Sequence, residues 1–497
     1  SHTGRKMNKK EIVIDQEKGL TRVAVLEDDE LCEFYLEREG AEKQAGNIYK
    51  GRVQNVLPGM QAAFVDIGTD RNAFLYLGEP ELDKRDFVFG GEGEAPRIQR
   101  PKKPVKSGQE IMVQVIKEPD ATKGARITTH ITLPGRYVVL APSVDYVGVS
   151  RRIRDDAERQ RLKEEAERVQ PEGMGLIVRT AAEGMNAEDF AADIETLTAR
   201  WKEIEKRFQV RKAPCCIHKD ESLISRTVRD LFTPDVDRLV LEKGENVEKV
   251  RETLRSISPE LENRVVPYEG QLPVFDAYRI ESRLDKALQH KVWLKNGGYL
   301  YVDQTEALTV IDVNTGKFVG SLDLQDTVFR MNCEAAVEIA RQIRLRDLGG
   351  IIIIDFIDME SPEHQQQVVE ALRDALKRDR NKTNVVGLTG LGLVEMTRKK
   401  MRSKLSERME KTCPCCGGTG RVMQEEHTAR RALRDAARIL SSGAKEGIVL
   451  SANEEVLDCV RQLAPEGIYL KPDNRKRSGD YHVSTEPESE CEGLERT

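Results

Sequence analysis

The sequence predicts a multidomain α/β protein that includes a small β-barrel. Its 497 residues exceed what one hydrophobic core supports, so roughly three to five domains are expected. Hydrophobic residues make up 39% of the chain and charged residues 33%, a balance typical of a globular protein with a highly charged surface. Short strand patterns follow one another from Gly46, whereas residues 272–411 alternate strand and helix patterns. This contrast indicates a β-domain and an α/β domain in the same chain.

The first third of the chain has the patterns of β-structure. Residues 11–38 alternate strand-like runs with turns, which predicts a small antiparallel sheet. Between the third and fourth strands of the next region, residues 78–108 are rich in Pro, Gly and Lys and predict a long surface loop. Five short strands with glycine-marked bends predict a closed barrel of the OB type: NIYKGRVQNVL, QAAFVDIG, NAFLYL, QEIMVQVIKE and GARITTHITL.

The middle of the chain mixes strands and helices. Two strands, RYVVL and GMGLIVRT, flank a charged helix predicted at residues 151–169. Apolar residues at spacings of three and four over residues 187–209 predict an amphipathic helix. Strand and helix patterns over residues 224–268 indicate a further α/β piece.

Residues 272–411 form the richest α/β block. Strands are predicted at residues 299–313 and 350–358, with a helix at 324–346 between them. A further helix is expected to open at Ser361-Pro362, because serine is a good N-cap and proline suits the first helical position. A helix at residues 429–440 and a small mixed domain follow.

Two predicted strands of this block end in acidic residues. The run of four isoleucines before Asp355 is typical of a strand buried on both faces, where a charge is costly. Asp312 ends a similar strand, and Asn314 lies on the same face two residues later. Paired carboxylates suit Mg²⁺, which takes one or two of them with waters and substrate phosphates. The alternative is that both carboxylates only cap strands in solvent.

Three of the nine cysteines fall within residues 413–416. Cys413 and Cys416 have the C-x-x-C spacing that chelates Zn²⁺ from a tight turn, which leaves Cys415 as a surplus thiol. Tetrahedral zinc needs four ligands, and no second such motif follows, so a second copy of the chain is expected to supply the other pair. The alternative is a reducible thiol pair or half of a broken zinc ribbon.

The cysteine pattern and the chain start also bear on location. In a reducing compartment, clustered cysteines are expected to bind a metal and not to form a disulfide framework. The first residues lack the apolar core of a signal peptide, and no run of about 18 apolar residues occurs in the chain. We therefore expect a cytoplasmic protein without a membrane span.

Basic and aromatic residues indicate nucleic-acid binding despite a net charge of −6. Basic islands occur at residues 97–106, 150–154 and 397–404, and together they fit a track for phosphates. In the predicted barrel, Phe64 and Phe74 could stack on unpaired bases. The basic side chains of Lys50, Arg52 and Lys123, in the same region, could bind the RNA backbone. The alternative is two core phenylalanines.

A second phosphate contact is suggested where the strand GMGLIVRT ends. Arg179 and Thr180 combine a guanidinium and a hydroxyl, which grip a phosphate by a bidentate contact and one further hydrogen bond. A surface arginine is the alternative.

The order of the motifs resembles the catalytic half of the ribonuclease E/G family of bacterial endoribonucleases. The resemblance runs from about Lys10 to Gly420, and the lack of a long scaffold after it favours the short members of the family. The motifs that carry it are NIYKGRV and AAFVDIG of the barrel, PEGMGLIVRT, TEALTVIDVNTG, ARQIRLRDLGGIIIIDFIDM and CPCCGGTG.

The resemblance implies a Mg²⁺-dependent endoribonuclease that acts on single-stranded RNA in rRNA maturation and mRNA turnover. It implies a preference for 5′-monophosphorylated RNA and products with a 5′-phosphate. Carried onto this sequence, it implies that Asp312 and Asp355 bind Mg²⁺ and that Asn314 orients the site. The family's 5′-phosphate contacts fall on Arg179, Thr180, Gly135 and Val139, its RNA contacts on Phe64, Phe74 and Lys123, and its shared zinc cysteines on Cys413 and Cys416.

The same resemblance implies a domain plan and an oligomer. Two zinc-linked protomers are expected, with pairing of dimers into a tetramer through the C-terminal domain. The implied domains are an RNase H-like subdomain split between residues 1–45 and 224–290, an S1-type OB barrel (46–130), a 5′-sensor domain (131–223), a DNase I-like catalytic domain (291–411), the zinc link (412–420) and a small oligomerisation domain (421–497).

Phosphodiester hydrolysis needs an activated water and charge neutralisation at the phosphate, and carboxylate-bound Mg²⁺ supplies both. The seven histidines belong to no recognisable Ser/His/Asp or Cys/His motif. One rival hypothesis is a non-catalytic RNA-binding adaptor that uses the barrel and a zinc-bridged dimer. Another is a DNA nuclease with the same metal chemistry.

Overall fold

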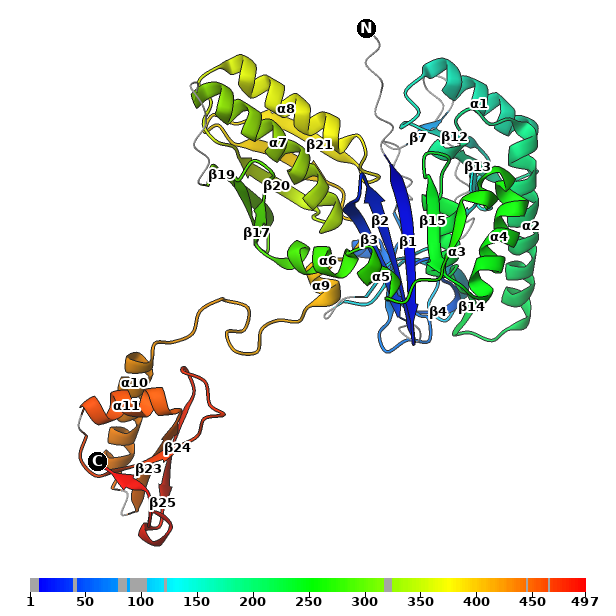
Figure 1. Cartoon of the computed structure of the whole chain (residues 1–497). Helices are drawn as coiled ribbons and strands as arrows, with labels where there is room; N and C mark the ends of the chain where they lie inside the picture. Colours follow the sequence, from blue (N-terminus) through cyan, green and yellow to red (C-terminus); the bar gives the residue numbers. More distant parts are fainter. Residues whose placement is uncertain are drawn as a thin grey trace. The chain divides into compact units, whose positions relative to one another are not determined.

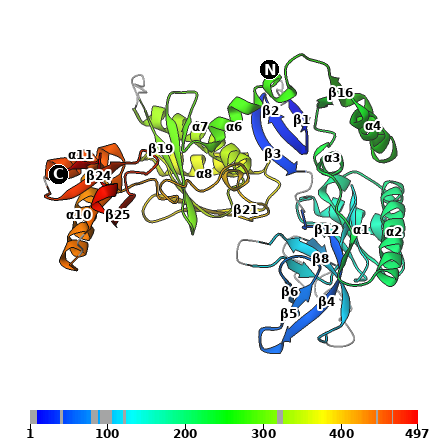
Figure 2. The same ribbon diagram turned by 90° about the horizontal axis from the view of Figure 1, so that it is seen from below.

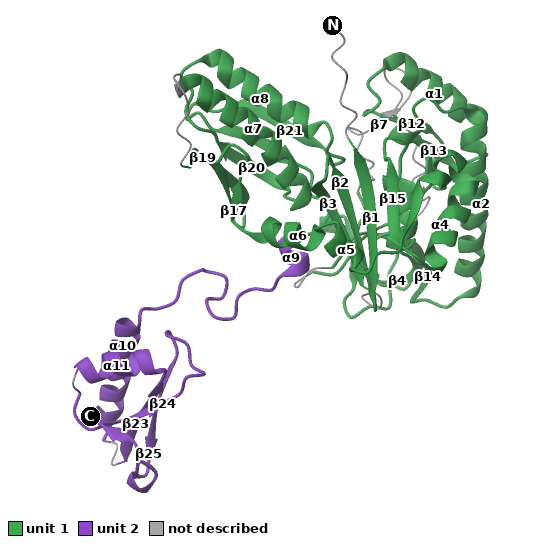
Figure 3. Cartoon of the chain, viewed as in Figure 1, with its two compact units in different colours: residues 1–405 green, residues 406–497 purple. Residues whose placement is uncertain are grey.

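The computed structural model describes residues 9–38, 43–78, 87–89, 105–119, 123–316, 324–443, 446–463 and 465–497. The chain is a mixed α/β protein with two compact units, residues 1–405 and residues 406–497 (Figure 3). Among the described helices, none combines the length and the apolar character that crossing a bilayer requires.

A five-stranded sheet has the order β16-β15-β1-β2-β3. It combines two segments that are far apart in the sequence, residues 10–38 and residues 238–268. Alternate residues of β1 enter different hydrophobic clusters, Ile12 and Ile14 on one face and Val13 on the other, so both faces are covered. The strands are β1 (Lys10–Glu17), β2 (Leu20–Glu27), β3 (Glu30–Arg38), β15 (Arg238–Glu242) and β16 (Val265–Tyr268). The helices packed with them are α3 (Leu223–Arg226), α4 (Glu245–Ile257), α5 (Val274–Ala277) and α6 (Ile280–Leu288).

The predicted barrel is confirmed as a closed five-stranded one. It closes because the long first strand, β4 (Ile48–Leu57), pairs with both β5 (Ala62–Asp66) and β8 (Glu110–Lys117). Its other strands are β6 (Ala73–Tyr76) and β9 (Arg126–Thr128), which pair in parallel. Figure 2 shows β4, β5, β6 and β8 gathered together. A later strand, β14 (Cys215–His218), pairs antiparallel with residues 48–50 at the start of β4.

The next sheet, in the order β10-β11-β13-β12-β7, packs against two helices. The helix expected at residues 187–209 is α2 (Ala187–Val210), which begins at a capping box of Asn186 and Asp189. The other elements are β10 (Leu133–Pro134), β11 (Val138–Ala141), β12 (Val147–Ser150), α1 (Asp156–Arg168) and β13 (Gly175–Val178).

The expectation of a loop throughout residues 78–108 is wrong at one place. Residues Phe87–Phe89 form β7, which pairs antiparallel with β12. An edge strand exposes unpaired backbone N–H and C=O groups, so a short apolar segment can add to it even within a Pro- and Gly-rich range. Residues 79–86 and 90–104, with most of the basic island at 97–106, lie outside the described residues.

The α/β block is a six-stranded sheet in the order β17-β18-β19-β20-β22-β21. The expected strand at 299–313 is two antiparallel strands, β18 (Tyr299–Gln304) and β19 (Leu308–Asn314), because the chain turns between them. The remaining strands are β17 (Lys291–Trp293), β20 (Gly350–Asp355), β21 (Thr383–Leu388) and β22 (Val394–Arg398).

Two helices cover one face of this sheet, α7 (Leu324–Leu345) and α8 (Pro362–Leu376), which lie side by side (Figure 1). Ser361 caps α8 as predicted, accepting a hydrogen bond of 3.3 Å from the backbone N–H of His364. Alternate strand residues such as Ile311, Val313 and Ile354 are buried under the helices. The residues between them face the other side of the sheet.

Buried ion pairs connect the last turn of α7 to the split sheet. Arg344 lies 2.7 Å from carboxylate oxygens of both Glu27 and Glu33, and the Arg344 and Glu33 side chains are buried. The Tyr35 hydroxyl donates to Glu33 at 2.6 Å. Desolvation opposes ionisation of Glu33, but Arg380 and Arg344 outweigh it and hold the Glu33 pKa far below its usual range. This network holds the α/β block against the split sheet.

The second unit begins within α9 (Leu405–Met409) and contains a small α/β domain. Its sheet has the order β25-β23-β24-β26 and packs against two helices. Its elements are α10 (Glu425–Ser441), β23 (Gly447–Ala452), α11 (Glu454–Leu463), β24 (Ile468–Pro472), β25 (Tyr481–Glu486) and β26 (Glu495–Arg496).

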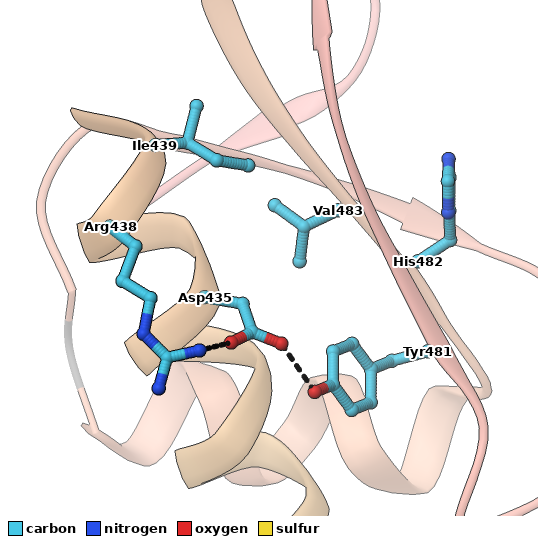
Figure 4. Close-up of a pocket in the computed structure, with 6 residues that line it drawn as sticks. All are labelled: Asp435, Arg438, Ile439, Tyr481, His482 and Val483. Atoms are coloured by element: carbon cyan, nitrogen blue, oxygen red, sulfur yellow. Dashed lines mark hydrogen bonds and ion pairs between the residues drawn. The ribbon is translucent and has the colours of Figure 1, made fainter. Parts of the chain in front are cut away.

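An open hollow of about 510 Å³ lies between α10 and β25 of this unit (Figure 4). Asp435 accepts hydrogen bonds from the Tyr481 hydroxyl at 2.6 Å and from Arg438 at 2.7 Å. The first of these bonds ties the helix to the strand. The hollow is lined by Asp435, Arg438, Ile439, Tyr481, His482 and Val483.

Candidate functional site

The two predicted acidic strand ends meet in the structure. Asp312 of β19 and Asp355 of β20 are register partners on adjacent parallel strands, which lie about 4.8 Å apart in a sheet. Their neighbours Ile311 and Ile354 are buried under α7 and α8, so both carboxylates lie on the opposite side, which we call the open face. The open face also carries the exposed side chain of Ile351, so the prediction that this strand is buried on both faces is wrong.

The electrostatics of this pair favour a cation. Burial, followed by the charges of Asp312 and Asp358, raises the pKa of Asp355. The Asn314 amide donates a hydrogen bond of 2.8 Å to Asp312, which fixes the orientation of that carboxylate. In the part of the chain that the structure describes, no three or more His, Cys, Asp or Glu side chains gather as a metal site. Two carboxylates with waters and a substrate phosphate still fit Mg²⁺, and the role of the pair stays a prediction.

Three of the residues predicted to grip a 5′-phosphate lie at one end of β13. The Arg179 guanidinium donates to the carbonyl of Gly135. The Thr180 hydroxyl lies 3.3 Å from that of Ser150. A side chain at Gly135 would collide with the carboxylate of Asp193, so only glycine allows the backbone this close approach.

The loop that carries Gly135 is held by Asp193 of α2, which accepts backbone hydrogen bonds of 2.8–3.1 Å from residues 136–138. Val139, the fourth predicted contact, is half-buried on β11 opposite Ile177. It lies on the same face as Arg179, which follows Ile177 by two residues.

Sequence reasoning missed the partners of Arg179. The Arg179 guanidinium donates a hydrogen bond of 2.7 Å to the Asp230 carboxylate. Asp230 also accepts from Arg229 at 2.9 and 3.0 Å, and its backbone carbonyl accepts from Arg380 at 2.7 Å. Burial opposes ionisation of Asp230, but Arg229 and Arg179 outweigh it and lower its pKa. No local pattern marks these residues, because they come from segments far apart in the sequence.

The two barrel phenylalanines are cross-strand partners on β5 and β6. Their ring centroids lie 5.9 Å apart with an edge-to-face geometry of 69°. Both rings are half-buried and alternate with the core residues Val65 and Leu75, so they lie on the outer side of the barrel wall. This position disagrees with the alternative of two core phenylalanines. Lys123, the third predicted RNA contact, is exposed shortly before β9.

The expected contribution of Lys50 to an RNA surface is wrong. Its side chain is buried, and its ammonium donates to the carbonyls of Phe208 and Arg211 at 2.9 Å each. It also pairs with Glu110 at 3.0 Å. Arg52 shares that carboxylate at 3.1 Å. These contacts give Lys50 a structural role that ties the barrel to the end of α2.

The cysteine cluster forms a tight turn in the second unit. The backbone N–H of Gly417 donates to the carbonyl of Cys413 at 2.9 Å, and that of Gly420 donates to the sulfur of Cys416 at 3.3 Å. Backbone hydrogen bonds from Gly420 and Gly418 lower the pKa of the Cys416 thiol. A thiolate is the form that binds zinc. The turn therefore fits a zinc ligand pair, and Cys415 beside it is exposed.

Comparison with known proteins places the chain in a family. A model of the S1 RNA binding domain matches residues 42–130, which span the barrel. A model of the Ribonuclease E/G family matches residues 132–401, more than half of the chain. The chain belongs to the ribonuclease E/G family. The family match includes the two carboxylates, Arg179 and Asp230, whereas Cys413 and Cys416 lie beyond it.

Several named members of the ribonuclease E/G family align with most of this chain. Ribonuclease G of Salmonella typhimurium is 41% identical over 451 residues, which cover 91% of this chain and 92% of the relative. Ribonuclease G of Haemophilus influenzae is 42% identical, covering 90% and 91%. Ribonuclease E of the same organism is 39% identical over 86% of this chain but only 45% of its own length. The alignment thus spans nearly all of the ribonuclease G relatives.

Proposed function

We propose that this protein cuts single-stranded RNA in RNA processing and decay, with Mg²⁺ bound at Asp312 and Asp355. Its family membership makes it an endoribonuclease. The observation that carries the rest is the register pairing of the two carboxylates on the open face of the sheet. Asp355 is exposed on this face, whereas the opposite face is occupied by α7 and α8.

The chain's own residues divide the chemistry between them. Bound Mg²⁺ would polarise the scissile phosphate and lower the pKa of a water molecule. Asp312 and Asp355 would hold the cation, and Asn314 keeps the Asp312 carboxylate in one orientation through its 2.8 Å hydrogen bond. The raised pKa of Asp355 means that charge on this carboxylate is costly until a cation neutralises it. Products would carry a 5′-phosphate.

A 5′-monophosphate on the RNA would bind at the end of β13. Arg179 would supply the positive charge and Thr180 a hydroxyl. The backbone at Gly135 would approach the phosphate closely, and Val139 would form an apolar wall. In the structure the Arg179 guanidinium is paired with Asp230, so the phosphate must share that guanidinium or replace the carboxylate. Occupation of this site would stimulate cleavage by holding the RNA 5′ end.

The barrel would hold the RNA beside these sites. Phe64 and Phe74 present half-buried rings on the outer side of the barrel wall, where bases can stack, and Lys123 adds positive charge. In the domain plan of the family, the barrel corresponds to the S1 domain and the sheet around β13 to the 5′-sensor domain. The split sheet corresponds to the RNase H-like subdomain, and the six-stranded sheet to the DNase I-like catalytic domain.

Zinc would join two copies of the chain. Cys413 and Cys416 of each copy provide two of the four ligands of a tetrahedral site. The small domain of residues 421–497 would then pair such dimers into a tetramer. The geometry of the cysteine turn supports the zinc link, and the family resemblance supports the tetramer. The cysteine pattern of the sequence, which suits metal ligation, supports a cytoplasmic location.

The decisive experiment compares three substrates. A 5′-monophosphorylated single-stranded RNA, a 5′-hydroxylated copy and a single-stranded DNA of the same sequence are incubated with Mg²⁺ and then with EDTA. We expect Mg²⁺-dependent cleavage of both RNAs, faster for the monophosphorylated one, and little cleavage of DNA. Binding without cleavage would support an RNA-binding adaptor, and equal cleavage of DNA would support a general nuclease.

A further inference from the structure

The open face of the six-stranded sheet carries a group of aromatic side chains. Trp293, Tyr299 and Tyr301 come from the adjacent strands β17 and β18. The side chain of Trp293 is 64% exposed and that of Tyr301 is 40% exposed. Large exposed aromatic side chains in one group are unusual for a surface without a binding role.

These rings are ordered by contacts among themselves and with one cation. Trp293 and Tyr299 lie edge to face with centroids 5.4 Å apart, and Tyr299 and Tyr301 do so at 5.7 Å. The ammonium of Lys291 lies 4.1 Å from the Trp293 ring centre and 3.8 Å from that of Tyr299. We call these four residues the aromatic platform. Its rings are held in place before any ligand binds, which reduces the entropy lost on binding.

The first row of the platform leads to the candidate active site. Trp293 pairs with Tyr299 across β17 and β18, and Tyr299 pairs with Asn314 across β18 and β19. Neighbouring strands lie about 4.8 Å apart, so Trp293 is roughly 10 Å from the residue that orients Asp312.

The second row ends at the carboxylates themselves. Lys291 pairs with Tyr301, Tyr301 with Asp312, and Asp312 with Asp355. Register partners share a face of the sheet, so a positive charge, an aromatic ring and the two carboxylates follow one another in a line. In this line the ammonium suits a backbone phosphate and the ring suits a base, while the carboxylates would accept a phosphate through a bound cation.

We propose that the aromatic platform binds unpaired bases of the RNA next to the phosphate that is cut. The proposal rests on the proposed function and adds a base-binding site to it. Stacking on an aromatic ring accepts any base, because every base has a flat π-face. Lys291 attracts the backbone phosphates that accompany these bases. The platform thereby aligns the scissile bond with Asp312 and Asp355 and favours single strands, whose bases are free to stack.

The chemistry of the platform favours RNA over a protein partner. An apolar protein surface would gain little from an ammonium and two carboxylates in the same rows. A nucleotide uses all three groups, because its base stacks, its phosphate attracts the ammonium and its scissile phosphate needs the metal that the carboxylates hold.

Kinetics on 5′-hydroxylated single-stranded RNA test the platform without the 5′-phosphate site. Trp293→Ala should raise KM by about 5- to 150-fold, the range expected for the loss of one stacked base, and should change kcat less. Trp293→Phe keeps a ring and should remain within a few-fold of the parent. Val337→Ala removes an exposed apolar side chain from α7, on the far side of the sheet, and should leave KM unchanged.

Fluorescence gives a readout that does not depend on cleavage. The chain has two tryptophans, Trp201 and Trp293, so Trp201→Phe leaves Trp293 as the sole tryptophan. In that background, with Asp355→Asn to prevent cleavage, single-stranded oligoadenylate should quench the emission to saturation. An abasic oligonucleotide of equal length should not. Equal quenching by both would show that phosphate charge, not base stacking, reaches this face.

The outcomes separate the platform from the proposed function. Unchanged KM in Trp293→Ala, with a parent protein that cleaves RNA, would overturn the platform and leave the nuclease assignment intact. A parent that fails to cleave RNA but is quenched by oligoadenylate would overturn the function and retain the base-binding site. If Trp293→Ala instead converts the protein to smaller species in sedimentation, the face joins copies of the chain and the proposal is wrong.

Discussion

The Arg179 guanidinium donates a 2.7 Å hydrogen bond to the Asp230 carboxylate, although Arg179 is the residue predicted to grip the 5′-phosphate of RNA. The carboxylate therefore occupies part of the hydrogen-bonding capacity that a phosphate would use. Arg229 binds the same carboxylate, and Arg380 from beyond α8 binds its backbone carbonyl. Asp230 thus connects the phosphate site to the α/β block that carries Asp312 and Asp355.

Arg179→Ala should slow cleavage of 5′-monophosphorylated RNA and barely affect a 5′-hydroxylated control. The lost charge-assisted hydrogen bonds correspond to roughly 1.5–3 kcal/mol, or about 10- to 150-fold in kcat/KM. The measurement is kcat/KM on the two substrates. An equal loss on both would mean that Arg179 has a structural role through Asp230.

Asp230→Asn should increase discrimination in favour of the 5′-monophosphate. The amide keeps a hydrogen-bond acceptor for Arg179 but removes the negative charge that competes with the phosphate. We expect a several-fold rise in the ratio of kcat/KM for monophosphorylated over hydroxylated RNA. A fall in that ratio, with an unchanged thermal midpoint, would show that the carboxylate positions Arg179 for the phosphate instead of competing with it.

Asp312→Asn or Asp355→Asn should abolish cleavage and leave RNA affinity largely intact, because the metal stabilises charge in the transition state while the barrel supplies most of the binding. Cleavage assays in Mg²⁺ and fluorescence anisotropy with labelled RNA measure the two properties. Asp303→Asn, at an exposed position of β18 in the same sheet, is a matched control and should stay active. Vigorous Mg²⁺-dependent cleavage by either active-site variant would refute the site.

Cys413→Ser combined with Cys416→Ser should remove zinc and shift the protein to smaller species at low micromolar concentration. Structural zinc contributes on the order of 10 kcal/mol or more, enough to hold a subunit interface. Metal analysis of the parent should give about half a zinc per chain, since each copy supplies two of four ligands. Cys415→Ser is the matched control and should keep the metal. One zinc per chain, or a double variant that stays dimeric, would exclude the shared site.

Acid should destabilise the first unit through Glu33. Its pKa is lower in the folded protein than the value of about 4.3 in an unfolded chain, so its ionised form stabilises the fold above that pH. This stability is lost as the pH falls from about 4.3 toward the folded pKa. Glu33→Gln should lower the thermal midpoint at pH 7, with a cost of about 3–5 kcal/mol for breaking a buried pair, and flatten the acid dependence.

The control for this prediction is Glu205→Gln, at an exposed position of α2. It should leave both the midpoint and its pH dependence nearly unchanged, because substitutions at exposed positions change the free energy of unfolding little. Identical acid profiles for Glu33→Gln and the parent would show that other carboxylates control the acid transition.

Local patterns were enough for much of the fold. The barrel strands, the amphipathic helix α2 and the serine cap of α8 follow from apolar spacing and from residue preferences at turns and helix ends. These features depend on neighbours within a few residues, so the sequence displays them directly. The strand β7 was missed because its pairing with β12 depends on an edge provided by a distant segment.

The candidate site shows the same division. The sequence by itself indicated that Asp312 and Asp355 follow apolar strand runs, because a charge is tolerated where such a run stops. The structure shows that β19 continues to Asn314 and that β20 is buried on one face only, with Ile351 exposed on the other. Only the tertiary structure decided that these strands are adjacent and in register, that Asp230 binds Arg179, and that Lys50 is buried. It also decided that Tyr301 is in register with Asp312 and Asp355, and that the row of Trp293 and Tyr299 ends at Asn314. Pairing between strands joins residues far apart in the chain, and no local preference encodes which strand lies beside which.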